Sequence, residues 1–128
     1  MDRLSIRIKT KISNNDICND KDLALEYLND DLVLYKDIMK TFVKSSAEDI
    51  KCLKLGIELK DFKLIRNIIH KIKGYSYYIG NKDLYDYGNY LCTLLVKKRF
   101  LGIKRKVKIF IDYFMLVVDY KKRELNNV

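Results

Sequence analysis

Apolar positions recur with the period of an α-helix over most of the chain. Beyond the first 30 residues they lie three or four positions apart, which places them on one face of a helix. Start and stop signals separate four segments, which begin near Asp31, at Asp61, at Asn81 and after Gly102. The pattern therefore predicts four amphipathic helices, the first of which ends near residue 59.

Each predicted helix carries an apolar stripe that we expect to face a shared core. The stripes are Leu34, Ile38, Phe42, Ile50, Leu53 and Ile57; Leu64, Ile65, Ile68, Ile69, Ile72 and Ile79; Leu84, Gly88, Leu91 and Leu95; and Ile103, Val107, Phe110, Phe114 and Val117. Serines and acids at 45–49 resemble a second helix start and predict a kink or break there. Short connections make successive helices antiparallel neighbours. We expect an all-α fold, an antiparallel up-down-up-down four-helix bundle.

The N-terminal segment follows a different pattern. Leu4, Ile6 and Ile8 alternate with arginine and lysine at the period of two that is typical of a strand. Because one isolated strand is not stable, residues 1–19 are predicted to form a flexible or loosely docked arm. The alternative is a segment that orders on a partner or on a second copy of the chain. A short extra helix around Lys21 to Leu28 is expected to open the helical bundle domain, residues 20–128.

Length and composition favour one helical domain. A chain of 128 residues fits a single core, and the absence of proline leaves every predicted helix uninterrupted. The longest apolar run, 113–118, falls far short of the roughly 20 residues that span a bilayer. The N-terminus lacks the apolar stretch of a secretory signal. We expect a cytoplasmic protein with no membrane contact.

The cysteines Cys18, Cys52 and Cys92 are odd in number and widely spaced. They offer neither a disulfide framework nor a CxxC metal or redox pair, so they are interpreted as reduced thiols. No metal site and no cofactor are expected.

The net charge of +9 is large for a domain of this size. An acidic protein, a nucleic acid or an anionic membrane surface would balance it, although a low-GC coding bias would also produce the lysine excess. Seven cations gather within residues 97–108, three of them in the first turns of a predicted helix, where the helix dipole disfavours positive charge. A basic helical module that binds nucleic acid is therefore an alternative, but no recognised nucleic-acid motif supports it.

One face of the second predicted helix carries polar residues around the only histidine. On a 3.6-residue helix these residues are offset from the isoleucine stripe, so the histidine is predicted to be exposed. The face comprises Lys63, Arg66, Asn67, His70, Lys73, Gly74 and Tyr77. A lone histidine is more often an ordinary residue than a functional one, so its neighbours decide the interpretation.

Two cations and a glycine lie near His70 on this face. Arg66 and Lys73 lie one turn before and after it, where they can pair with a phosphoryl group on the imidazole, Lys73 as a point charge. Glycine within a helix costs about 1 kcal/mol relative to alanine, so Gly74 calls for a reason. Close approach of another molecule supplies one. The face thus combines an acceptor atom, charge stabilisation and an access gap.

At these residues the sequence resembles the histidine-containing phosphotransfer (HPt) domains. The family pattern, roughly H-x-L-K-G, five variable residues, G, three more and L, matches residues 70–74, Gly80 and Leu84, with Ile72 in place of leucine. Further matches are Leu34, Tyr35, Phe42 and Asp61, where the family carries its L-Y, its F and its acidic turn. The resemblance covers about residues 20 to 122.

The resemblance implies a phosphoryl carrier in a two-component phosphorelay. His70 would accept the group from a receiver-domain phosphoaspartate and pass it to another receiver, with Lys73 as electrostatic support and Gly74 as clearance. Such domains bind no nucleotide and have no independent kinase activity, because the receiver supplies the aspartate and the metal ion. Positioning and charge stabilisation are what phosphoryl transfer mainly requires. The family expectation is a monomer whose partners are receivers of response regulators or hybrid histidine kinases.

Tyr75, Tyr77 and Tyr78 depart from the family, which usually has small residues there. Tyr77 is expected on the His70 face with Lys63, Arg66 and Asn67, where a receiver would dock, as a specific contact or as a block to standard partners. An unphosphorylated adaptor that binds receivers is a further alternative. The dimerisation helices of a histidine kinase are disfavoured, because lysine follows the histidine and proline is absent.

Overall fold

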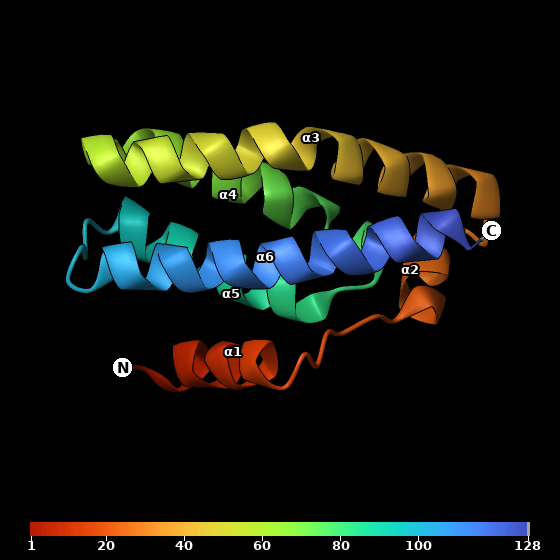
Figure 1. Ribbon diagram of the computed structural model, residues 1–128, viewed down its shortest axis with the longest axis horizontal. Coiled ribbons are helices and arrows are strands. Elements are labelled where there is room, and N and C mark those ends of the chain that lie inside the picture. The colour runs from red at the N-terminus through yellow and green to blue at the C-terminus, as the bar shows by residue number, and fades with distance from the viewer. Residues whose placement is uncertain (128) are drawn as a thin grey trace.

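The computed structural model describes residues 1–127 and is all-helical over that range (Figure 1). The helices are α1 (Arg3–Ser13), α2 (Lys21–Tyr27), α3 (Leu32–Leu59), α4 (Phe62–Tyr75), α5 (Lys82–Val96) and α6 (Ile103–Asn126), with a 3-10 turn, η1 (Tyr77–Ile79), between α4 and α5. The predicted all-α fold is confirmed, as is the short helix before the long ones. No helix within the described residues has both the length and the hydrophobicity to cross a bilayer.

The four helices α3 to α6 enclose the main core. Helix α3 contacts α4 and α6, and α5 contacts the same two helices, so each of the four contacts two of the other three (Figure 1). The predicted stripes of α5 and α6 are buried throughout. Near the centre, the rings of Phe42 and Phe114 meet edge to face with centroids 5.5 Å apart, a favourable aromatic geometry.

Side-chain caps fix where the helices begin. The carboxylates of Asp31 and Asp61 and the amide oxygen of Asn81 each accept a hydrogen bond from the backbone N–H three residues later, at 2.8–3.1 Å. These bonds satisfy N–H groups that have no partner within the helix. The caps predicted at Asp61 and Asn81 are therefore confirmed.

Helix α3 differs from its prediction in two respects. The helix is continuous through 45–49, because the hydroxyl of Ser46 donates to the carbonyl of Val43 at 2.6 Å instead of capping a new helix. The predicted break is wrong. The inward stripe is also shifted by one position at its start: Leu34 is 42% exposed while Tyr35 is buried. The buried positions of α3 are Tyr35, Met39, Phe42, Ser46, Asp49, Leu53 and Gly56.

The expected strand-like, loosely docked arm is wrong as well. Residues 3–13 form α1, which packs against α5 and α6 and buries Ile8 in the core. The hydroxyl of Ser5 lies 2.8 Å from that of Tyr87, and Lys11 pairs with Asp83. The alternation misled because Leu4, Ile8 and Ile12 are also four residues apart, which suits a helix equally well.

Gly80 joins α2 to the turn after α4. Its φ is +76°, its carbonyl accepts the N–H of Asp20 at 2.8 Å, and a Cβ at this position would lie 2.1 Å from the Asp20 carbonyl oxygen. A side chain therefore cannot fit between the two backbones. Gly80 therefore allows the backbone at the start of α2 to pack directly against the end of η1.

Candidate functional site

His70 lies on the outward face of α4. The opposite face buries Ile65, Ile69 and Ile72 in the core, while His70 is exposed. The predicted exposure of the histidine is therefore confirmed. We call Arg66, Asn67, His70, Lys73 and Gly74 the His70 surface.

A shallow depression of about 280 Å³ adjoins His70 between α4 and α5. It is lined by Arg66, Asn67, His70, Cys92 and Val96. Burial raises the pKa of the Cys92 thiol, and the positive charges of Lys73 and Arg66 oppose that rise. The thiol therefore stays protonated near neutral pH and is a poor nucleophile. Both cations exert a positive potential on this depression.

The amine of Lys73 is directed toward α5. Its Nζ atom lies 3.4 Å from the amide oxygen of Asn89 and 5.6 Å from the ring centroid of Tyr85. Within residues 1–127 no carboxylate forms an ion pair with Lys73 or Arg66. Neither cation is neutralised, so both can contact an anion at this surface.

Gly74 has no internal reason to be a glycine. A Cβ built on it meets no atom within 4 Å, and its backbone is helical. Alanine would therefore fit sterically and would favour the helix. The space above Gly74 is open to another molecule.

Tyr77 does not lie where the helical spacing predicted. Helix α4 ends at Tyr75, and Tyr77 belongs to the 3-10 turn η1, so the α-helical spacing from His70 does not extend to it. Its ring packs against Tyr27 and Tyr85, with centroids 5.1 Å and 4.7 Å apart. Because Tyr85 also lies beneath the Lys73 amine, Tyr77 reaches the edge of the His70 surface indirectly.

The other predicted site residue and the two remaining tyrosines lie around this surface. Lys63 is exposed near the start of α4. Tyr75 packs on Phe42 with centroids 5.6 Å apart, and Tyr78 is exposed beside Tyr27. Only Tyr75 is thus part of the packing of the core.

Sequence reasoning missed the contribution of α5. Tyr85, Asn89, Cys92 and Val96 border the His70 surface, and they recur at intervals of four, three and four residues. That spacing marks one stripe of a helix. The signal was present, but it becomes a site only once α5 is known to lie beside α4.

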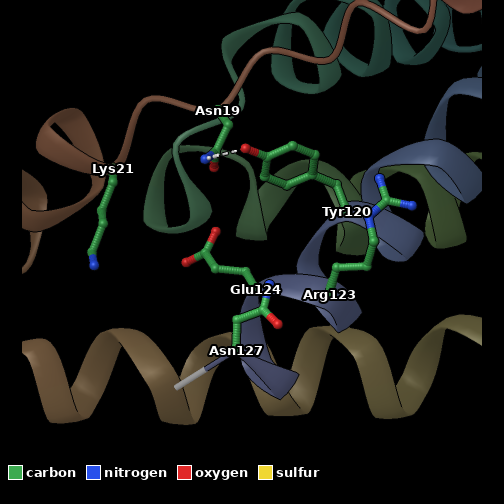
Figure 2. A pocket seen from close by; sticks show the side chains of 6 residues that line it. All are labelled: Asn19, Lys21, Tyr120, Arg123, Glu124 and Asn127. Carbon is green, nitrogen blue, oxygen red and sulfur yellow. Dashed lines mark hydrogen bonds between the residues drawn. The ribbon is translucent and has the colours of Figure 1, made fainter.

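A larger pocket of about 520 Å³ lies between α2 and the end of α6 (Figure 2). Figure 2 shows the side chain of Asn19 pointing at Tyr120, to whose hydroxyl it donates at 3.2 Å. Beside it, buried Lys121 donates to the hydroxyl of Tyr35, which itself donates to Glu124 at 2.7 Å. These hydrogen bonds link α3, α6 and the segment before α2, while Lys21 and Arg123, which also line the pocket, are exposed.

Residues 1–127 bring no three histidine, cysteine or carboxylate side chains together in a way that would hold a metal ion. Comparisons with protein-family models, with curated proteins and with solved structures returned no match to this chain. The inference of function therefore depends on the chemistry of the residues themselves.

Proposed function

We propose that this protein is a histidine phosphotransfer protein of a cytoplasmic two-component phosphorelay, with His70 as the residue phosphorylated. The observation that carries the proposal is the exposed His70, which lies between two cations without ion-pair partners in residues 1–127 and beside a glycine that faces open space. The similarity of residues 70–84 to the HPt pattern adds to it. In this proposal α3 to α6 form the antiparallel up-down-up-down bundle of that family, and the protein acts as a monomer.

The proposed transfer needs one nucleophile. An unprotonated imidazole nitrogen of His70 attacks the phosphorus of a receiver's phosphoaspartate. The N–P bond forms as the P–O bond breaks, and the aspartate leaves as a carboxylate. The aspartate of a second receiver reverses the step. The receiver supplies the metal ion, and the carrier has no kinase activity of its own.

Lys73 and Arg66 would stabilise the transferring group. The phosphoryl oxygens carry negative charge throughout the transfer, and positive side chains placed beforehand lower its energy. The Lys73 amine is held by one amide and one ring, and both contacts are weaker than an ion pair with phosphate. The open space at Gly74 would admit the receiver's acidic pocket.

The test is to mix the purified protein with a phosphorylated receiver from the same cell. We expect label on the protein that is acid-labile and base-stable, as phosphohistidine is. His70→Gln should abolish the label and keep the helical circular dichroism, because the side chain is exposed. Lys122→Ala, which changes an exposed residue of α6, serves as the control and should keep the label.

Absence of label with every native receiver would refute the carrier proposal. If receivers then still bind the protein, the same surface belongs to an unphosphorylated adaptor. Loss of fold in His70→Gln would instead indicate a structural histidine.

A further inference from the structure

A second surface lies at the end of the molecule where α3 meets α4 and α5 meets α6. Figure 1 shows both connections at one end, and the rings of Phe62 and Phe100 join them by stacking with centroids 4.1 Å apart. We call this surface the basic tip. It comprises Leu59, Lys60, Val96, Lys97, Lys98, Arg99, Leu101, Lys104 and Arg105.

The basic tip concentrates positive charge that the fold does not neutralise. Its six cations are exposed, and none forms an ion pair within the described residues. Lys106, by contrast, turns inward and contacts Asp2 at 3.5 Å and the hydroxyl of Tyr90 at 3.0 Å. Lys104 and Arg105 also stand in the first turn of α6, where the helix dipole disfavours cations. An anionic partner would relieve this repulsion.

Apolar side chains project from the same tip. Leu101 is 95% exposed, Leu59 64% and Val96 60%. The exposure of Leu101 follows from a defined turn: Gly102 has φ +72°, and the N–H of Ile103 donates to the carbonyl of Phe100 at 3.0 Å. Phe100 is anchored on Phe62 just before the turn. The turn therefore directs the side chain of Leu101 outward, next to the packed ring of Phe100.

We infer that the basic tip docks on the surface of an anionic lipid membrane. The cations would contact the lipid headgroups while Leu101, with Leu59, enters the boundary with the acyl chains. This inference differs from the expectation of no membrane contact, which followed from the absence of a bilayer-spanning segment in the sequence. A peripheral contact needs no such segment.

Both charge and shape favour lipid over the other anionic or apolar partners. A nucleic-acid backbone would use the cations but would leave the projecting leucines in water. A second copy of the tip would repel the first through like charge. Membrane docking uses both features at once.

Docking through Leu101 would leave His70 accessible, although Val96 lies at the edge of the basic tip and also lines the depression beside His70. His70 is eight residues beyond the start of α4 at Phe62, about 12 Å along the helix. It also lies on the side of α4, not at its end. The inference is therefore independent of the proposed phosphotransfer.

The first test is sedimentation with vesicles. We expect the protein to bind vesicles of phosphatidylcholine with about 30% phosphatidylserine and not vesicles of phosphatidylcholine alone. Binding should weaken between about 100 mM and about 500 mM salt. Lys97→Ala with Lys98→Ala should weaken binding about tenfold or more. Lys40→Ala with Lys44→Ala removes the same charge from exposed positions of α3 and should weaken it less than about twofold.

The second test reports insertion. The chain has no tryptophan, so Leu101→Trp introduces a single fluorescent reporter. Its emission should shift to the blue on phosphatidylserine vesicles, whereas that of Val33→Trp, at an exposed position near the start of α3, should not. Equal losses in the two lysine pairs, or an unshifted Leu101→Trp, would overturn the inference. So would a DNA duplex that displaces the protein from vesicles while Leu101→Ala binds them normally.

Discussion

The Nζ atom of Lys71 lies 2.9 Å from a carboxylate oxygen of Asp49, which α3 buries against α4. Hydrogen bonding to Asp49 raises the pKa of Lys71, so the lysine remains charged across the ordinary pH range. Lys73, two residues later, has no such acid. The two lysines that follow the histidine along α4 therefore have different tasks: Lys71 stabilises the fold, and Lys73 remains available to an anion.

We expect Lys71→Ala and Lys73→Ala to separate these tasks. Removing Lys71 leaves Asp49 buried without its partner and should lower the free energy of unfolding by about 2 kcal/mol. Lys73→Ala should leave stability nearly unchanged and slow the proposed transfer about tenfold. Urea denaturation and a timed transfer assay measure the two effects. An unchanged transfer rate in Lys73→Ala would refute the role assigned to that lysine.

Two glycines should respond to alanine in opposite ways. Gly74→Ala meets no atom within 4 Å and should stabilise the helix by about 0.5–1 kcal/mol, yet slow the proposed transfer about tenfold or more, because the added methyl occupies the receiver's approach. Gly80→Ala would place its Cβ against the Asp20 carbonyl and should cost at least about 2 kcal/mol. Thermal unfolding checks both. Wild-type transfer by a stabilised Gly74→Ala would show that the partner does not use that space.

Two fully buried serines form a matched pair. In residues 1–127, Ser76 Oγ is the one buried side-chain nitrogen or oxygen without a hydrogen-bond partner, whereas Ser5 Oγ bonds to Asp2 and Tyr87. Ser76→Ala removes an unsatisfied group and should raise the free energy of unfolding by about 1 kcal/mol. Ser5→Ala should lower it by a similar amount. Equal losses in both variants would contradict the difference in bonding.

Asp2 should make the contribution of α1 to the stability of the fold depend on pH. Burial alone would raise its pKa, but hydrogen bonds from the amide and hydroxyl of Ser5 outweigh burial and lower the pKa from 3.8 to about 2. A carboxyl with a lowered pKa stabilises the fold above its unfolded value and loses that effect as the pH falls from about 4 toward 2. Asp2→Asn keeps a capping oxygen and removes the charge. It should cost about 1 to 2 kcal/mol at pH 7 and almost nothing near pH 2.

The control for this pH series is the difference between wild type and Asp2→Asn at each pH, because other carboxyls titrate in both proteins. A difference that stays constant from pH 7 to pH 2 would contradict the lowered pKa of Asp2.

Local signals made the starts of α3 to α6 predictable, and long-range pairing made the inner face of α3 unpredictable. Asp61 and Asn81 cap helices through bonds that span three residues, so the sequence contains both partners. Asp49, by contrast, is buried because Lys71 reaches it from another helix. Hydrophobic periodicity treats such a residue as a surface position. The prediction for the N-terminal segment failed for a different reason, since its few apolar residues fit both the period of a strand and the period of a helix.

The candidate site, too, was predictable where local sequence signals determine it and unpredictable where it depends on contacts between helices. The exposure of His70 could be predicted because α4 has a strong isoleucine stripe opposite it. Tyr77 could not be placed, because α4 ends at Tyr75 and the spacing of an α-helix does not extend into the 3-10 turn. The neighbours from α5, such as Tyr85, depend on how two helices pack together. The sequence contains their spacing but not the contact.

The salt bridge between Asp2 and Lys106 determines where a tag or protein fused before Met1 would lie. It holds the start of α1 beside the first turns of α6, and Figure 1 shows the start of α1 and the end of α6 at opposite ends of the molecule. An affinity tag or fluorescent protein fused before Met1 would therefore crowd the basic tip. The same fusion beyond the end of α6 would leave it unobstructed.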